Sequence, residues 1–476
     1  FTKRWSAGGA HWALPMQRAQ CRMNGKPLLR RYVDLGGYFM SVVRSIQQMV
    51  EWHEGVEPEL TEVMLALQED SVGTGKTAFG KTGQWAIKDG LGQGCAAAAI
   101  RSKYMTALIQ RAVGRLSIGY EFVGTGEVGD TWFADDGAFL AESVAGLQLF
   151  FDVAWVVTRI AGLDLITKPD GSKTAWSGVV KVGPVWTPLE GKWTIRLPDG
   201  KVVPWVAQYK HLGWMEVVMS GTLGAAAEWK EDRERITKAM KRAIGMAGRI
   251  PYLCADQLGE MMGMIMGGVI GYYGRGTPID DDTCQRIVGV QEYVARVRGF
   301  GTGRPHIMMY EDDAGLGWPH PYEAVAATLF AQVDEIMGSG KDAPARKAFL
   351  AVLMQVTYKL GCREVDPLAW LPTHLEEHLS QDCLVEAWLL AKVRAKVEAG
   401  RTEGVMEEGW DERWKANGRG RKIWEDGRSV GHIAMQLVSA GLVQWGDYTD
   451  GGDWMGWERA RGKHDLGVQC KIRYEA

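Results

Sequence analysis

No pair of cysteines in this 476-residue sequence has the spacing of a zinc site or of a redox motif. The seven cysteines are scattered along the chain, at Cys21, Cys95, Cys254, Cys284, Cys362, Cys383 and Cys470. Secreted disulfide-stabilised domains carry densely spaced cysteines, and structural zinc sites usually carry them in close pairs. The scattered pattern is therefore typical of reduced thiols in an intracellular protein.

No signal peptide and no long hydrophobic run is visible in the sequence. The uncharged, strongly apolar run at 261–274 has 14 residues, whereas a membrane-spanning helix needs about 20. We therefore expect a buried helix there and no membrane partner. The net charge of −3 neither favours nor excludes nucleic acid, because a basic groove can lie within a chain of neutral total charge. Phe1 in place of an initiating methionine predicts a fragment of a longer protein.

Helices and short strands alternate in the first half of the sequence. No element is predicted before residue 29; segment 29–35 is typical of a strand, and 73–89 of a hairpin. Another hairpin is predicted from strand 117–123, a glycine-rich turn and the single strand "TWFADDGAFL" (131–140). Apolar residues recur at helical spacing in 41–55, 60–70, 95–116 and 145–163. This order predicts an α+β fold.

From about residue 224 onward the pattern is mostly helical. In 228–250, Ile236, Met240 and Ile244 share one face, and basic residues including Lys230 and Arg233 lie mostly elsewhere. Such a basic face is either solvated or in contact with phosphate groups.

Two adjacent carboxylates, Asp135 and Asp136, interrupt the apolar segment "TWFADDGAFL". Burying them is costly unless a cation accompanies them. An exposed pair in a turn is the ordinary explanation, but the apolar neighbours favour Mg²⁺ binding, because Mg²⁺ prefers oxygen ligands. A two-metal site needs a further carboxylate. Asp34, at the end of strand 29–35, can supply it with Phe39 as a pocket wall, although alone it would also suit a turn or helix N-cap.

Taken together, these segments resemble the palm of a reverse transcriptase of the non-LTR retrotransposon type. "VDLGGYFMSV" (33–42) is similar to the first palm motif of that family, and "FADD" (133–136) is similar to its metal-binding signature. The other similar segments are "DGLGQGCAAAA" (89–99) for the Gly-x-x-Gln-Gly motif, "AGLDLITKPDGSKTAW" (161–176) for the Gly-Leu…Lys-Thr segment and "YKHLG" (209–213) for the primer grip. Five motifs in the family's order are far more specific than any one of them.

The resemblance implies a role for individual residues. Asp34 and Asp135 would be catalytic metal ligands, Asp136 would be a supporting catalytic residue, and Phe39 would exclude a ribose 2′-hydroxyl. The nucleotide and template contacts would be Arg4, Gln93, Gly94 and Lys173, with Lys168 as the second choice for Lys173, and the primer grip would comprise Tyr209, Leu212 and Gly213.

The implied activity is that of an RNA-directed DNA polymerase, in which a primer 3′-hydroxyl attacks the α-phosphate of a dNTP. The implied cofactor is a pair of Mg²⁺ ions, with Mn²⁺ as the alternative, and the implied partners are an RNA template, a DNA primer and dNTPs. The resemblance also implies a nuclear location, whereas the oligomeric state is not predicted. Without magnesium and substrate, mutual repulsion should raise the pKa of the three carboxylates, and no compensating charge is expected from the sequence itself.

The resemblance divides the chain into a fingers remnant (1–31), a palm (32–220), a helical thumb-like region (221–300) and a mostly helical C-terminal region (301–476) without an assigned function. In this family most of the fingers precede the first palm motif, and here only 33 residues precede Asp34. The missing fingers favour an inactive fragment, whereas the three palm carboxylates favour an active parent protein. The alternative function is a decayed or domesticated, non-catalytic palm that binds nucleic acid.

Other short motifs fit their chemistry poorly. "SVGTGKTAFG" (71–80) follows a helix rather than a strand, so a phosphate-binding P-loop is disfavoured, and "GTGEVG" (124–129) leads into a strand, as a hairpin turn does. "HLEEH" (374–378) has metallopeptidase spelling but also suits a helix start behind a capping box. Segment 413–424 is a flexible basic linker or a single-strand contact, and "YTDGG" (448–452) resembles at most a truncated ribonuclease H start.

Overall fold

The computed structural model describes residues 7–69, 71–74, 76–78, 80–87, 89–91, 96–221, 226–251, 253, 255–298, 318–361, 373–404, 449–450 and 453–454. The chain forms two compact units. The first comprises Phe1–Glu228 and Val333–Gln355, and the second comprises Trp229–Gln332 and Val356–Ala476.

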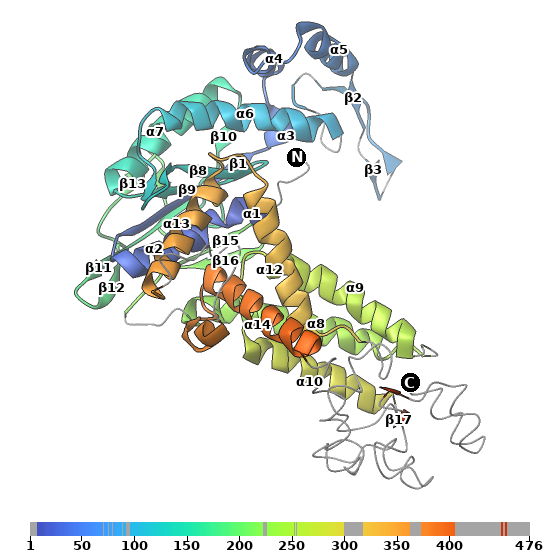
Figure 1. Ribbon diagram of the computed structural model, residues 1–476. Helices are drawn as coiled ribbons and strands as arrows, with labels where there is room; N and C mark the ends of the chain where they lie inside the picture. The colour runs from blue at the N-terminus through green and yellow to red at the C-terminus, as the bar shows by residue number, and fades with distance from the viewer. Residues whose placement is uncertain are drawn as a thin grey trace. The chain divides into compact units, whose positions relative to one another are not determined.

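An antiparallel sheet lies at the centre of the first unit (Figure 1). Its middle strand β1 (Leu28–Gly36) pairs with β9 (Asp136–Ala141) on one side and with β11 (Ala175–Val182) on the other. The strand order is β12–β11–β1–β9–β8, where β8 is Asp130–Phe133 and β12 is Val185–Pro188, and β10 (Asp164–Leu165) pairs with the end of β1. The strand predicted at 29–35 is therefore confirmed.

Alternate residues of β1 face opposite sides of the sheet, because side chains alternate along a strand. Leu29, Val33 and Leu35 belong to the main apolar core. Arg30 and Tyr32 face the other side, where they contact the hairpin of β15 (Gln208–His211) and β16 (Trp214–Val217). Asp34 follows Tyr32 by two residues, so its side chain lies on the same side of the sheet as this hairpin.

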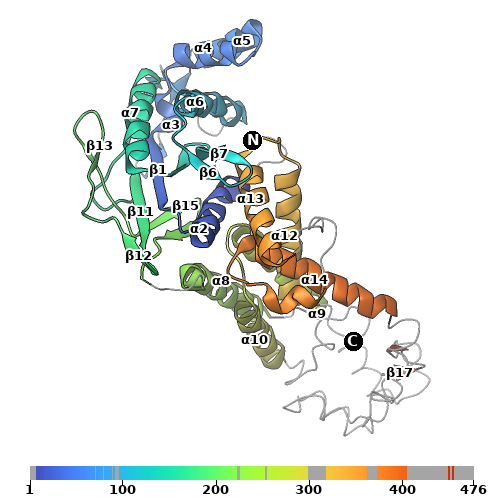
Figure 2. The same ribbon diagram turned by 60° about the vertical axis from the view of Figure 1, so that its left-hand side comes forward.

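Both faces of the sheet are covered (Figures 1 and 2). On the core face, α6 (Ala96–Gly114) packs against α7 (Val144–Ile160), and both contribute fully buried side chains such as Ile109 and Phe150. On the opposite face, α2 (Ala13–Asn24) lies beside the β15–β16 hairpin and contacts β1. These layers fix the positions of the strand ends, where the candidate site lies.

The remaining elements differ between the units. Those of the first unit are α1 (Ala7–His11), α3 (Tyr38–Ser41), α4 (Arg44–His53), α5 (Pro58–Glu69), β2 (Val72–Gly73), β3 (Lys76–Thr77), β4 (Gly80–Lys81), β5 (Trp85–Ala86), β6 (Tyr120–Phe122), β7 (Gly126–Val128), β13 (Ile195–Arg196), β14 (Val202–Val203) and most of α13 (Pro344–Lys359). The second unit is mainly helical and contains most of α8 (Ala226–Ala247), α9 (Ala255–Tyr273), α10 (Asp281–Val297), most of α12 (Pro321–Met337), the 3₁₀-helix η1 (Thr373–His378), α14 (Leu384–Gly404), β17 (Thr449–Asp450) and β18 (Asp453–Trp454).

The mixture of helices and antiparallel strands confirms the α+β prediction in its general form. The helices predicted at 41–55, 60–70, 95–116 and 145–163 correspond to α4, α5, α6 and α7, and the hairpin predicted at 73–89 corresponds to β2–β5. The division into fingers, palm, thumb and C-terminal region stays a prediction.

Several local predictions were wrong. The segment "TWFADDGAFL" is not one strand, because the chain reverses within it: β6 pairs with β7, and β8 pairs separately with β9. Residues 7–24, for which no element was predicted, form two buried helices. Helix α9 is amphipathic rather than buried all round, since Met264 is 70% exposed.

The predicted basic face of 228–250 is wrong for Arg233, which is buried. Its guanidinium donates to the carboxylate of Asp382 and to the carbonyls of Pro278 and Gln381. The apolar face is confirmed, because Ile236, Met240 and Ile244 are fully buried.

None of the described helices combines the length and the apolar character that crossing a membrane requires.

Candidate functional site

Three carboxylates come together at one end of the central sheet. Asp34 on β1 and Asp136 on β9 are directly opposite each other in the antiparallel register, so their side chains lie on the same face. Asp135 immediately precedes Asp136 in the loop between β8 and β9. All three residues are partly buried. Residues about one hundred positions apart in sequence are thus neighbours because β1 is the central strand.

The loop that carries Asp135 is a tight hairpin turn. Phe133 and Asp136 pair across it, so Ala134 and Asp135 are its two loop residues. Ala134 has φ +56°, the sign that a two-residue hairpin turn requires at its first position. A side chain in this conformation costs about 1 kcal/mol relative to glycine. Next to the loop, a Cβ added at Gly137 would lie 2.6 Å from the Trp132 ring, so a larger side chain at this position would displace the ring.

A lysine compensates the charge of Asp34. The Lys173 ammonium donates to Oδ2 of Asp34 at 2.8 Å. The neighbouring Thr174 fixes the backbone there, because its hydroxyl accepts from the amide of Asp34 at 3.1 Å and donates to the carbonyl of Asp34 at 3.3 Å. The expectation that no compensating charge comes from the sequence was therefore wrong.

The electrostatics of the three carboxylates are dominated by burial. Burial raises the pKa of Asp135, and the charge of Asp34 adds to this effect. Burial, followed by the charges of Asp135 and Asp34, raises the pKa of Asp136 to about 6. The hydrogen bond to Asp34 raises the pKa of Lys173. Mutual repulsion therefore contributes to the raised carboxylate pKa values, as expected, but desolvation contributes more.

The β15–β16 hairpin approaches the carboxylates through two stacked tyrosines. The Tyr209 ring stacks on the Tyr32 ring with centroids 4.0 Å apart and planes 4° apart, and Tyr32 is two residues from Asp34. Leu212 and Gly213 form the two-residue hairpin loop, with φ +50° and +94°. The sequence segment predicted to contact a primer is thus positioned on the carboxylate face of the sheet.

Phe39 and Tyr38 follow β1 in the short helix α3. Phe39 is partly buried and packs against the main core, and its ring contacts the Tyr38 ring edge-on at 5.4 Å. Tyr38 is fully buried, and its hydroxyl donates to the carbonyl of Ser102. Three other predicted contact residues, Arg4, Gln93 and Gly94, lie outside the described residues.

A buried charge network behind the hairpin escaped the sequence analysis. Glu216 on β16 accepts from Arg18 on α2 and from Arg30 on β1, and its other oxygen lies 3.2 Å from Nε2 of His11. The His11 and His211 rings approach within 3.4 Å through their Nδ1 atoms. Burial acts to raise the pKa of Glu216, but Arg18 and Arg30 lower it to about 2. A signal was present in the continuous apolar run at 12–16 (Trp-Ala-Leu-Pro-Met), which indicates a buried segment.

The three carboxylates are chemically suitable ligands for a hard divalent cation, but they are not arranged around a metal position. Carboxylate oxygens are the protein ligands that Mg²⁺ prefers. Within the described part of the chain, however, no group of three or more His, Cys, Asp or Glu side chains is arranged to hold a metal ion. Lys173 instead takes one oxygen of Asp34.

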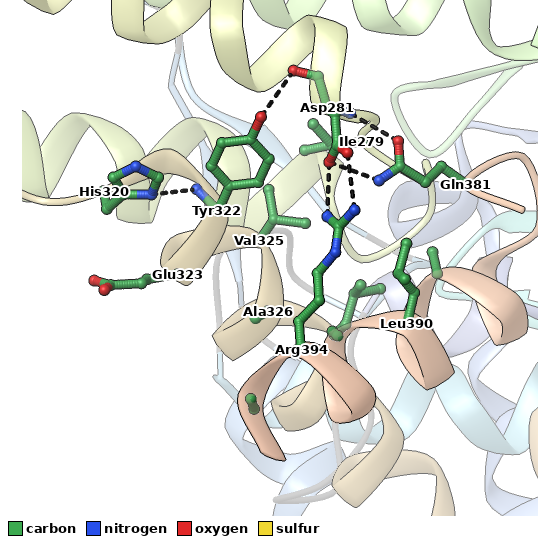
Figure 3. A pocket seen from close by; sticks show the side chains of 14 residues that line it. Ile279, Asp281, His320, Tyr322, Glu323, Val325, Ala326, Gln381, Leu390 and Arg394 are labelled. Atoms are coloured by element: carbon green, nitrogen blue, oxygen red, sulfur yellow. Dashed lines mark hydrogen bonds and ion pairs between the residues drawn. The ribbon is translucent and has the colours of Figure 1, made fainter. Parts of the chain in front are cut away.

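The second unit contains a separate pocket of about 450 Å³ (Figure 3). Its walls are largely apolar and include Val325 and Leu390. Its polar side is a self-contained network, because Asp281 accepts from Arg394 at 2.8 and 2.9 Å and from Gln381 at 2.6 Å. The side chains of Asp281, Arg394 and Gln381 therefore satisfy one another.

The 3₁₀-helix at 373–378 confirms helical structure at "HLEEH". Glu376 there accepts from Nε of Arg394 at 2.9 Å. The basic segment 413–424 lies outside the described residues, and the metallopeptidase alternative stays a hypothesis.

Comparisons with known proteins give little further information. No protein-family model and no curated protein matches the chain. Among solved structures, the chain is similar to telomerase from Candida albicans, which was solved in complex with a fragment of telomeric RNA, with a TM-score of 0.29 and 9% sequence identity. The match covers 77% of this chain and 52% of that chain, so the chain spans about half the length of that telomerase. At this TM-score, the likeness is too weak to assign a fold or a function.

Proposed function

We propose that this chain is an RNA-directed DNA polymerase of the non-LTR retrotransposon type, which extends a primer 3′-hydroxyl with dNTPs on an RNA template. The observation that supports this function is the register of β1 and β9. It brings Asp34 opposite Asp136 and next to Asp135, although the motifs that contain them are about one hundred residues apart in sequence. The resemblance to reverse transcriptases implies a cluster formed by these same carboxylates.

In this proposal, Asp34 and Asp135 would hold two Mg²⁺ ions once the ammonium of Lys173 has moved away. When bound, such ions stabilise the attacking and leaving oxygens of a phosphoryl transfer. Asp136 maintains the hairpin through its pairing with Phe133 and Asp34. Tyr209 and the Leu212–Gly213 turn present a rigid surface to the primer end, because Tyr209 is stacked on Tyr32.

The alternative, a non-catalytic palm that binds nucleic acid, is favoured by a different observation. Lys173 neutralises Asp34, and no three ligands are arranged for a metal in the described residues. A protein that has lost its chemistry would keep such an internal ion pair permanently. The two functions therefore differ in whether extension depends on the carboxylates.

The test is primer extension on an RNA template with Mg²⁺, comparing wild type with Asp34→Ala and Asp135→Ala. We expect either substitution to reduce extension to less than about one hundredth of the wild-type rate, because each removes a group that binds the reacting phosphate through metal. Both variants should remain folded, since these side chains are only partly buried. Circular dichroism melting checks the fold.

Asp164→Ala is the matched control. Asp164 lies on β10 of the same sheet, but its carboxylate is 63% exposed and pairs with Arg159. We expect wild-type extension from this variant. Undiminished extension by Asp34→Ala or Asp135→Ala would contradict the proposed function. An inactive wild type that still binds RNA would support the non-catalytic alternative.

A further inference from the structure

Lys173 occupies the position where a cation would bind Asp34. Its ammonium lies 2.8 Å from Oδ2 of Asp34, and its charge acts on Asp135 and Asp136 as well. One ammonium therefore faces three carboxylates. The surplus of negative charge leaves the site attractive to a cation of higher charge.

The ion pair can open without a change in the backbone. The Lys173 side chain is 36% exposed, and that of Asp34 is 16% exposed. Water screens such a pair, so that it contributes little net stability. The side chain of lysine is long and flexible, whereas an arginine would form a fixed bidentate pair.

The loop that carries Lys173 is itself well anchored. Thr174 is fully buried, and its amide donates to the carbonyl of Ile166 at 2.8 Å. Gly171 has φ +67°, its amide donates to the carbonyl of Lys168 at 2.9 Å, and it packs against Val206. Rotation of the Lys173 side chain alone is therefore the simplest way to expose Asp34.

We propose that Lys173 is a resident counter-ion that competes with a divalent metal ion for Asp34, so that metal binds only when this ion pair opens. This inference rests on the proposed function in that it assigns metal binding to the same carboxylates. It accounts for two observations together: the carboxylate ligands are of the kind that Mg²⁺ prefers, but in the described residues they are not arranged around a metal ion.

Mn²⁺ binding to the purified protein tests the competition. The free ion is measured by electron paramagnetic resonance, without primer, template or dNTP. We compare wild type with Lys173→Met, which keeps the length of the side chain but removes its charge. We expect Lys173→Met to bind Mn²⁺ about tenfold more tightly, because neither the ion pair nor the repulsion between the ammonium and the metal remains.

Lys168→Met provides the matched control. Lys168 is exposed in the same loop, and its removal changes the net charge by the same amount. We expect its Mn²⁺ affinity to stay within about twofold of wild type, because water and salt screen an exposed charge. Lys173→Gln serves as a second neutral variant if Lys173→Met does not fold.

The gain in affinity must depend on Asp34. Adding Asp34→Asn to Lys173→Met should abolish the tighter binding. Equal affinities of wild type and both neutral variants at 173, a gain that survives Asp34→Asn, or a lack of Mn²⁺ binding in every protein would each overturn the inference.

Failure of this inference and failure of the proposed function are distinguishable. If Lys173→Met binds Mn²⁺ more tightly but the wild-type protein does not extend a primer, Lys173 is a counter-ion and the polymerase function is contradicted. If extension depends on Asp34 but the Mn²⁺ affinity is the same with and without the charge of Lys173, the polymerase function is supported and the counter-ion role of Lys173 is contradicted.

Discussion

At the scale of single residues, two carboxylates on the same side of the sheet are compensated in different ways. Glu216 is almost completely buried and accepts from the guanidinium groups of Arg18 and Arg30. Asp34 is partly exposed and pairs with the flexible Lys173. The buried pairs of Glu216 are not expected to open, because opening them would leave charged groups buried away from both water and a partner. The second pair is in contact with water, so it can open without leaving a fully buried charge.

Replacing Glu216 tests how much the buried charge network contributes to the stability of the fold. We expect Glu216→Ala to lower the free energy of unfolding by about 3–5 kcal/mol, because the buried guanidinium of Arg30 loses its carboxylate partner and that of Arg18 loses the nearer of its two carboxylates, Glu228 at 3.5 Å being the other. Urea unfolding followed by circular dichroism measures the change. Glu190→Ala, at an exposed position, should change it by less than about 0.5 kcal/mol. Similar effects of the two substitutions would show that the network contributes nothing.

The carboxylates of the candidate site could be predicted from sequence, but their counter-ions could not. Asp34 and Asp135 belong to short motifs in a known order, and the structure brings these motifs together. The sequence Pro-Asp-Gly at 169–171 indicates a turn, but no local signal shows that Lys173 in this loop pairs with the distant Asp34. Glu216 and His11 are 205 residues apart, and a polar residue gives no sign in sequence of which distant partner will bury it.

At the scale of elements, a turn without glycine explains why the β8–β9 hairpin was not predicted. The β8–β9 hairpin reverses at Ala134, and the β15–β16 hairpin at Leu212, both non-glycine residues with positive φ. Turn prediction relies on glycine, asparagine and aspartate at such positions. In the β6–β7 hairpin, by contrast, Gly124 and Gly126 carry the positive φ, and the turn at "GTG" was predicted correctly.

Gly171, in the loop that carries Lys173, combines a positive φ with close packing against Val206. A comparison with Gly183 separates the effect of packing from that of backbone strain. Gly171 and Gly183 both have positive φ, so that alanine at either position costs about 1 kcal/mol of strain. An added Cβ at Gly171 would overlap Cγ1 of Val206, whereas one at Gly183 would meet nothing within 4 Å. We expect Gly171→Ala to be about 1–3 kcal/mol less stable than Gly183→Ala in urea unfolding. Equal stability of the two variants would mean that the loop is loosely packed.

At the scale of the whole molecule, the first unit is not continuous in sequence. Residues 333–355 belong to the same compact unit as residues 1–228. Sequence patterns predicted helices in this region, but a helical pattern does not reveal which distant segment it packs against. The prediction of a separate C-terminal region from residue 301 rested on the resemblance alone.

Specific contacts bind this returning segment to the first unit. The Phe349 ring lies 5.8 Å from that of Trp12, and both side chains are fully buried. The Thr125 hydroxyl donates to the carbonyl of Lys347 at 2.9 Å, which connects the β6–β7 hairpin to the same helix. The N-terminal helices, the hairpin and α13 therefore share one core.

Phe349→Ala tests whether this shared core stabilises the unit that carries the candidate site. We expect a loss of about 3–5 kcal/mol in the free energy of unfolding, because a buried aromatic ring is replaced by a cavity beside Trp12. Tyr358→Ala removes another aromatic ring from α13, but one that is 62% exposed, and should cost much less. If the two substitutions had equal effects, the returning segment would contribute no more than an exposed helix, and the first unit would be stable with residues 1–228 alone.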